Sequence, residues 1–160
     1  TISDRASAGV YEDRSGPALE DYLAQRLSCE IVATDVVPDD RGRITGQLRT
    51  WSDSGTADLI VTTGGTGVAP RDVTPEATAD VIERSVPGLA EAMRAASREI
   101  TPYGMLSRGL AGIRGQTMIV NLPGSPKGVR ENLTPLLPAL QHTLDKIHND
   151  PSDCGVGLSV

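Results

Sequence analysis

The chain has 160 residues, of which 38% are hydrophobic, and its formal net charge at pH 7 is -6. This length and apolar content suit one compact domain with its own core, which we expect over residues 1–148. The tail over 149–160 has no periodic apolar face. The acidic balance argues against a nucleic-acid partner, because proteins that neutralise phosphates usually carry a basic surface.

The sequence also argues against a membrane protein, a disulfide framework and a zinc site. Its longest apolar runs, of five to seven residues, are short of the roughly 20 that span a membrane, and no signal peptide is visible. The two cysteines, Cys29 and Cys154, lie far apart, and His142 and His148 are six residues apart, whereas helical ligand pairs are three or four apart. We therefore expect a cytoplasmic protein in a reducing compartment.

In the first half of the chain, apolar periodicity predicts two helices and three extended segments. The segment "TISDR" at 1–5 reads as the end of a strand. Apolar residues recur at helical spacing over 16–27 and again after "PDD", at Ile44, Leu48 and Trp51. The runs "CEIVATDVV" at 29–37 and "ADLIVTT" at 57–63 predict buried strands.

The second half predicts further helices and a strand pair. Thr74 is expected to cap a helix that begins at Pro75 and continues to the break at Pro87-Gly88, and a second helical face follows from Leu89 to Ile100. "AGIRGQTMIVNLPG" contains two extended runs about a turn at Arg114-Gly115. A last helical region begins at Pro126, and we expect two later prolines, at 135 and 138, to divide it.

Strands that alternate with helices predict the α/β class, with a parallel sheet covered on both faces. Ligands of such sheets bind beyond the carboxyl ends of the strands. Three predicted strands end in segments rich in glycine, proline or aspartate, at 36–40, 61–67 and 120–128. The segment at 1–5 would lie beside them if it is the end of a fourth strand. We therefore expect one site at one edge of the sheet.

The loop "TTGGTGVAPRDVTPEAT" at 62–78 is the most distinctive of these segments. Gly64, Gly65 and Gly67 could form only a tight turn, or a concave nest whose backbone N–H groups bind an anion. The loop matches neither the Walker A pattern nor the dinucleotide fingerprint, because Pro70 stands where the third glycine would be. Common nucleotide motifs therefore do not explain it.

Polar residues near these loops have two readings each. Asp39 and Asp72 could shape a turn or a helix start, or anchor a ligand, and for Asp40 we favour the helix start. "PGSPKG" at 123–128 could be only a loop shaped by prolines, although Ser125 and Lys127 offer a hydroxyl and a cation to a phosphate.

Three segments together resemble a known family. "TISDRASAGVYEDRSGPAL", "TTGGTGVAPRDVTPEAT" and "NLPGSPKGVRENL" are similar, in order and spacing, to the molybdenum cofactor biosynthesis proteins of the Mog and MoaB type, related to the G domain of gephyrin. The resemblance spans Thr1 to about Ile147. It implies a three-layer α/β/α fold with a mostly parallel sheet, and a homotrimer in the Mog branch. The implied activity is transfer of AMP from Mg-ATP to molybdopterin with release of pyrophosphate, ahead of a partner protein that inserts molybdate.

The resemblance also implies site residues. The two critical carboxylates of the family fall on Asp39 and Asp72, which we predict to be catalytic and to anchor Mg²⁺. The predicted contacts to molybdopterin or ATP are Ser3, Asp4, Asp13, Gly64, Gly65, Thr66, Gly67, Pro123, Gly124, Ser125 and Lys127. Which loop binds which ligand stays open. Two alternatives to catalysis also stay open, a MoaB-type paralogue that binds molybdopterin with little turnover and an oligomerising scaffold.

Overall fold

The computed structural model describes residues 1–148, and the predicted tail over 149–160 lies outside the described residues. A four-stranded sheet forms its centre, in the order β1-β4-β3-β2. The strands are β1 (Leu59–Thr63), β2 (Arg84–Ser85), β3 (Ala111–Arg114) and β4 (Thr117–Leu122). β1 and β4 run parallel, whereas β3 is antiparallel to both β4 and β2. The predicted α/β class is confirmed. The described sheet is mixed and not mostly parallel as predicted, because β3 pairs antiparallel with both of its neighbours.

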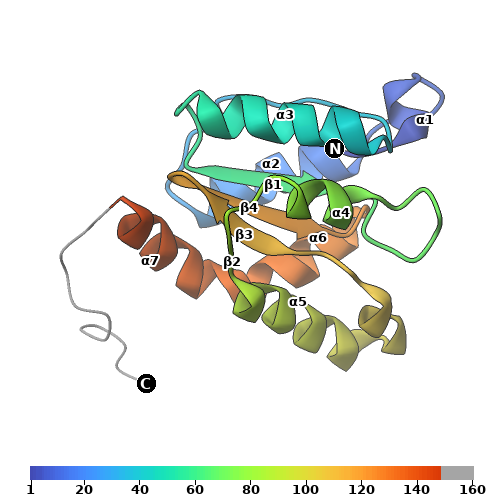
Figure 1. Cartoon of the computed structure of the whole chain (residues 1–160). Coiled ribbons are helices and arrows are strands. Elements are labelled where there is room, and N and C mark those ends of the chain that lie inside the picture. Colours follow the sequence, from blue (N-terminus) through green and yellow to red (C-terminus); the bar gives the residue numbers. More distant parts are fainter. Residues whose placement is uncertain (149–160) are drawn as a thin grey trace.

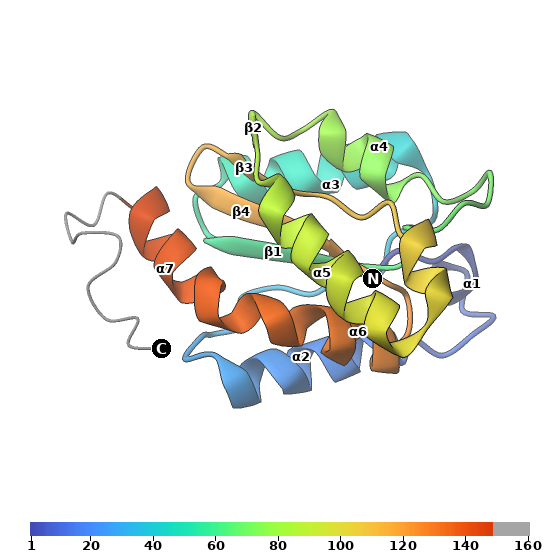
Figure 2. The ribbon, with the colours of Figure 1, turned by 90° about the horizontal axis from the view of Figure 1, so that it is seen from below.

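Helices cover both faces of this sheet (Figures 1 and 2). One face carries α3 (Arg41–Asp53) and α4 (Thr74–Ala79). The other carries α2 (Ser15–Arg26), α5 (Pro87–Ile100), α6 (Pro126–Leu133) and α7 (Leu137–Ile147). Short turns complete the chain: α1 (Asp4–Ser7), η1 (Pro102–Leu106) and η2 (Thr134–Leu136). In the described chain no helix is both long and apolar enough to cross a membrane.

The central strand β4 divides the core in two. Because side chains alternate along a strand, Met118, Val120 and Leu122 pack against α2, α5, α6 and α7, and Ile119 packs against α3 and α4. All six residues of β4 are buried. This apolar composition is typical of a strand covered on both faces.

The strand predicted at 29–37 is wrong for most of its length. Only Val37 pairs, in an isolated parallel bridge with Ile2, and the residues before it form no regular structure. Ile31 and Val32 are 39% and 56% exposed. An apolar β-branched run favours a strand, but without a neighbouring ladder along its length the backbone has no partner for strand hydrogen bonds.

The helix predicted from Pro75 to the Pro87 break is also too long. It ends at Ala79, after which Val81 enters the core and Arg84–Ser85 pair with β3. Pro87 instead begins α5.

The buried face of α5 ends before Ile100, the last residue of the predicted helical face. On α5, Ser97 is buried whereas Ile100 is 50% exposed. The β3–β4 turn has its positive φ at Gly115. The predicted division of the last helical region is confirmed: Pro135 lies in η2, which separates α6 from α7, and Pro138 lies in the first turn of α7.

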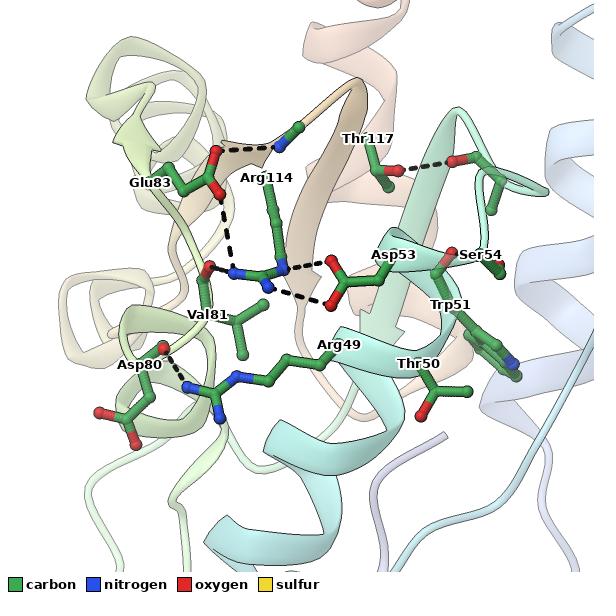
Figure 3. A network of polar contacts seen from close by, with 12 residues as sticks. Arg49, Thr50, Trp51, Asp53, Ser54, Asp80, Val81, Glu83, Arg114 and Thr117 are labelled. Carbon is green, nitrogen blue, oxygen red and sulfur yellow. Dashed lines mark hydrogen bonds and ion pairs between the residues drawn. The ribbon is translucent and has the colours of Figure 1, made fainter.

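A polar network connects α3 to the sheet at the edge where β4 begins (Figure 3). The Arg114 guanidinium donates to both carboxylate oxygens of Asp53, at 2.8 and 3.0 Å, and to the Val81 carbonyl at 3.3 Å. Glu83 accepts from the Gly115 amide at 3.1 Å. The network therefore joins α3, the segment before β2 and the β3–β4 turn, at the edge opposite the carboxyl ends of β1 and β4.

Candidate functional site

Four chain segments meet at the carboxyl edge of β1 and β4. The Ile2 amide donates to the Thr63 carbonyl at 2.8 Å, and the Ser3 amide donates to Val37 at 2.9 Å. On the other side, the Gly64 amide donates to the Leu122 carbonyl at 3.1 Å. The three predicted strand ends and the opening segment therefore lie at one edge, as the sequence predicted.

A cavity of about 230 Å³ opens at this edge. Seven of its lining residues were predicted site residues: Ser3, Asp13, Asp39, Gly64, Gly65, Asp72 and Gly124. The others are Thr1, Ile2, Ala6, Tyr11, Arg14, Ser15 and Pro126. The carboxylates of Asp13, Asp39 and Asp72 and a glycine backbone thus share one cavity with the start of α1 and α2.

Asp39 is fixed by a reciprocal pair of hydrogen bonds with Asp4. The Asp4 amide donates to Asp39 Oδ2 at 2.8 Å, and the Asp39 amide donates to Asp4 Oδ1 at 3.1 Å. Arg71 in turn donates to both oxygens of Asp4, at 2.7 and 2.8 Å from Nη2. Partial burial raises the pKa of Asp39, and the negative charges of Asp4 and Asp72 add to the rise. Asp39 is therefore held rigidly in a locally negative environment.

Asp72 is held by its own loop. Its Oδ2 accepts from the Ala69 amide at 2.8 Å, and the Asp72 amide donates to the Ala69 carbonyl at 2.9 Å. In both Asp39 and Asp72, one carboxylate oxygen is thus bonded to the backbone. Within residues 1–148, no hydrogen bond is formed by the second oxygen, Oδ1, of either side chain.

These carboxylates fit Mg²⁺ as a partner. Mg²⁺ usually takes one or two protein carboxylates and completes its shell with waters and substrate phosphates. Each aspartate has an oxygen available, and a divalent cation would offset the repulsion from Asp4 and Asp72 that adds to burial in raising the pKa of Asp39. Over the described residues no cluster of three or more His, Cys, Asp and Glu side chains is placed to hold a metal. A site that depends on substrate phosphates needs no such cluster.

The glycine loop closely approaches other parts of the chain. Gly64 and Gly65 have φ angles of 107° and 62°, which side chains other than glycine rarely adopt. A Cβ on Gly64 would lie 2.2 Å from the Ile2 carbonyl oxygen, and one on Gly65 would lie 2.3 Å from Thr74 Oγ1. The tight-turn reading of the loop is therefore confirmed, and Gly64 and Gly65 also line the cavity. Anion binding by their backbone N–H groups stays a prediction.

Thr74 holds this turn and does not cap α4. Its hydroxyl donates to the Gly64 carbonyl at 3.0 Å, and its amide donates to Gly65 at 3.1 Å. Val73 occupies the N-cap position without a side-chain hydrogen bond. Asp40, by contrast, caps α3 by accepting from the Arg43 amide at 2.8 Å, which confirms the helix-start reading.

Asp13 organises the side of the cavity next to α2. It accepts hydrogen bonds from the Thr1 hydroxyl at 2.5 Å, from Ser15 and from the Gly16 amide at 3.1 Å. Burial works to raise the pKa of Asp13, but the combined hydrogen bonds outweigh it and lower the pKa. Asp13 is therefore ionised and engaged by its neighbours.

Six predicted site residues do not line the cavity: Asp4, Thr66, Gly67, Pro123, Ser125 and Lys127. Ser125 is the N-cap of α6 and accepts from the Gly128 amide at 3.0 Å. Lys127 is 76% exposed and pairs with Glu131, 3.6 Å away. These contacts match the structural reading of "PGSPKG", and only Gly124 and Pro126 of that loop reach the cavity.

Tyr11 and Arg14 line the cavity but were not singled out from the sequence. Arg5 lies over the Tyr11 ring, 5.2 Å from its centroid, and this contact positions Tyr11 beside the opening. Arg14 brings a positive charge to a cavity that is also lined by three aspartates. Both residues lie in the first segment that carries the family resemblance, but neither was predicted, because their loop has no periodicity that indicates which side chains face the cavity.

The fold and the cavity define a three-layer α/β protein with a cavity lined by three aspartates at the carboxyl edge of its sheet. Residues 1–142 match the MoCF_biosynth family, described as "Probable molybdopterin binding domain", and the chain belongs to this family.

Named relatives and solved structures are similar to this chain over most of its length. A molybdopterin adenylyltransferase of Helicobacter pylori is 46% identical over 148 residues, which cover 92% of this chain and 84% of the relative. The structure of the molybdopterin biosynthesis enzyme MoaB from Thermus thermophilus is 47% identical, with a TM-score of 0.86 and coverage of 94% and 93% of the two chains. The Mog protein of Mycobacterium ulcerans is 43% identical, with a TM-score of 0.84 and coverage of 91% and 94%.

Proposed function

We propose that this chain is a molybdopterin adenylyltransferase. The proposal is supported above all by its 46% identity with the Helicobacter pylori enzyme of that name over 84% of the enzyme's length. The cavity adds independent support, because it places Asp39 and Asp72 beside a glycine-lined wall at the ligand-binding edge of the sheet.

In the proposed reaction, an oxygen of the terminal phosphate of molybdopterin attacks the α-phosphorus of ATP. The bond between the α-phosphorus and the bridging oxygen breaks, AMP joins the pterin phosphate, and pyrophosphate leaves. The attacking oxygen is already anionic at neutral pH, so no strong general base is required. Catalysis then depends on positioning and on neutralising charge.

The residues of this chain supply the positioning. Asp39 and Asp72 would hold Mg²⁺ through their Oδ1 atoms, and when bound the cation would neutralise charge on the phosphates. The bonds of Asp39 to Asp4 and of Asp72 to Ala69 fix the two carboxylates before any substrate binds. Gly64 and Gly65 leave the cavity wall free of side chains, so that a phosphate or a pterin can approach the backbone.

Pyrophosphate release from molybdopterin and Mg-ATP tests this function. We expect release that requires both substrates and Mg²⁺, and that falls strongly in Asp72→Asn. A protein that binds molybdopterin but releases no pyrophosphate would contradict the proposal. That outcome would favour the alternative, a MoaB-type protein with little catalysis, for which the 47% identity with a MoaB structure is the supporting observation.

The remaining features of the function are also proposals. They are a homotrimer, delivery of the adenylated product to the protein that inserts molybdate, a cytoplasmic location, and a single domain over 1–148. The resemblance to the Mog branch supports the first two.

A further inference from the structure

Arg108 makes an unusual set of contacts with the loop that carries Asp72. Its backbone amide donates to the Thr66 carbonyl at 2.9 Å, and its Nε donates to the Gly67 carbonyl at 2.6 Å. Its Nη2 donates to the carbonyl of Asp72 itself. Arg108 therefore contacts both the beginning and the end of the segment 66–72, which we name the aspartate loop.

The third guanidinium nitrogen is also engaged. Nη1 forms a close ion pair with Glu76 Oε1 on α4. The side chain of Arg108 is 38% exposed, so this ion pair alone would contribute little to stability. The planar guanidinium, however, spans three acceptors on two chain segments at once, which a lysine ammonium cannot do.

Arg108 extends from a segment that is itself fixed to the sheet. The Leu110 amide donates to Asn121 Oδ1 at 3.1 Å, and the Asn121 amide donates to the Leu110 carbonyl at 2.9 Å. Asn121 lies in β4 and is only 1% exposed. The aspartate loop is thus connected to the rigid central strand through Arg108.

From these contacts we infer that Arg108 is a positioning residue for adenylyl transfer: it fixes the aspartate loop, and it acts on the reaction through Asp72. The inference rests on the proposed function for its catalytic part. An arginine near a phosphate site would usually be assigned to phosphate binding. Here all three guanidinium nitrogens already donate to protein oxygens.

Hydrogen–deuterium exchange of the aspartate loop tests the positioning directly. We expect faster exchange of the amides of 66–72 in Arg108→Met and in Arg108→Lys than in the unchanged protein. Arg94→Met is the matched control, because Arg94 donates to the neighbouring Gly109 carbonyl at 3.2 Å and, within residues 1–148, forms no hydrogen bond or ion pair with the aspartate loop. Unchanged exchange in both Arg108 variants would overturn the inference, whether or not the protein is active.

Kinetics test whether Arg108 acts through Asp72. Loss of a residue that supports a metal-binding carboxylate typically costs about 10- to 100-fold in activity, and we expect a kcat loss of that size in Arg108→Met. Arg108→Lys should not restore kcat, and KM for ATP should change little. A direct phosphate contact would instead raise that KM, and lysine would restore much of the binding.

A double-mutant cycle completes the test. In the Asp72→Asn background, Arg108→Met should cause little further loss of turnover. Independent losses that multiply would overturn the inference. Should Arg108→Met fail to fold, Glu76→Gln weakens the same contact and should cause a smaller loss in the same direction. If the unchanged protein releases no pyrophosphate, the proposed function fails, and the exchange experiment still decides the positioning.

Discussion

Asp39 and Asp72 each combine one oxygen bonded to a backbone amide with one oxygen that has no hydrogen bond in the described chain. An asparagine in either place can still accept the amide hydrogen bond, but it removes the charge that a cation requires. We predict that Asp39→Asn and Asp72→Asn each lower turnover about 100-fold or more, because metal-assisted charge stabilisation is worth several kcal/mol.

The unfolding midpoint is the control for these two variants. Both side chains lie at the edge of the sheet and outside the two core clusters, so the midpoint should stay within a few degrees of that of the unchanged protein. Near-normal adenylation in either variant would show that its carboxylate is not a metal anchor. Loss of folding would favour a purely structural role.

The pH dependence of stability gives a second prediction, for Asp39 alone. Burial and the charges of Asp4 and Asp72 raise its pKa in the folded state, so folding favours the protonated carboxyl. Its contribution to stability is therefore fully present below the unfolded pKa of about 3.9 and is lost as the pH rises through the raised folded value.

Asp39→Asn removes this loss. Thermal unfolding of the variant and the unchanged protein should give similar midpoints at about pH 3, and the variant should become relatively more stable towards about pH 7. A difference that is constant over this range would contradict the raised pKa. Asp53→Asn, outside the cavity and paired with Arg114, is a control whose lowered pKa predicts the opposite trend.

Gly65 gives a third prediction, because the chain contains a matched glycine. Gly65 and Gly55 have φ angles of 62° and 68°, but a Cβ on Gly55 would meet nothing within 4 Å. Valine should destabilise both sites through backbone strain, by about 1–3 kcal/mol. Gly65→Val should destabilise the protein further, because its Cβ would lie 2.3 Å from Thr74 Oγ1.

Ligand binding separates the two roles of this glycine. Titrations with ATP and with molybdopterin should show weaker binding of at least one ligand to Gly65→Val and unchanged binding to Gly55→Val. If a folded Gly65→Val bound both ligands normally, the loop would be a turn only. Urea unfolding of both variants supplies the stability comparison.

At the scale of helices and strands, local signals predicted the helix-start aspartate, the proline break near α7 and the strand β4. Each depends on chemistry within a few residues, such as the Asp40 cap. Thr74 was misread because its hydroxyl donates to Gly64, ten positions earlier. The run at 29–37 has strand composition, but strand pairing depends on a neighbour that composition does not specify.

The candidate site shows the same division. Motif residues such as Asp39, Asp72 and the glycines could be found from the sequence, because their spacing is distinctive. Tyr11 and Arg14 could not, because only folding brings their loop to the cavity. Arg108 was missed for a related reason: its acceptors lie 32 to 41 positions away along the chain.

Asn121 connects three elements and gives a fourth prediction. From β4 its Nδ2 donates to Thr62 on β1 at 3.0 Å and to Thr78 on α4 at 2.9 Å. Asn121→Ala would leave these hydroxyls and the Leu110 amide without their hydrogen-bond partner. Each buried polar group that stays unpaired costs up to about 1–3 kcal/mol of folding free energy. We expect the free energy of unfolding to fall by about 2–4 kcal/mol in urea denaturation, which also includes the cavity left behind. A loss below about 1 kcal/mol would mean that the network is replaced by water.

At the scale of the whole molecule, the helices that carry the two core clusters lie on opposite faces of one sheet (Figure 1). The cavity lies at the carboxyl edge of that sheet. The site is therefore assembled from segments that both cores hold. We expect damage to either core to move the cavity walls relative to one another.

The last prediction concerns assembly. The resemblance to the Mog branch leads us to expect a homotrimer. The surface is consistent with association, because Tyr103, Met105 and Leu106 of η1 are 75%, 62% and 49% exposed, and contiguous exposed apolar side chains often mark interfaces. Sedimentation equilibrium at micromolar concentrations should give three times the chain mass of 16.8 kDa. A monomer under these conditions would contradict the prediction, and a hexamer would indicate the MoaB branch instead.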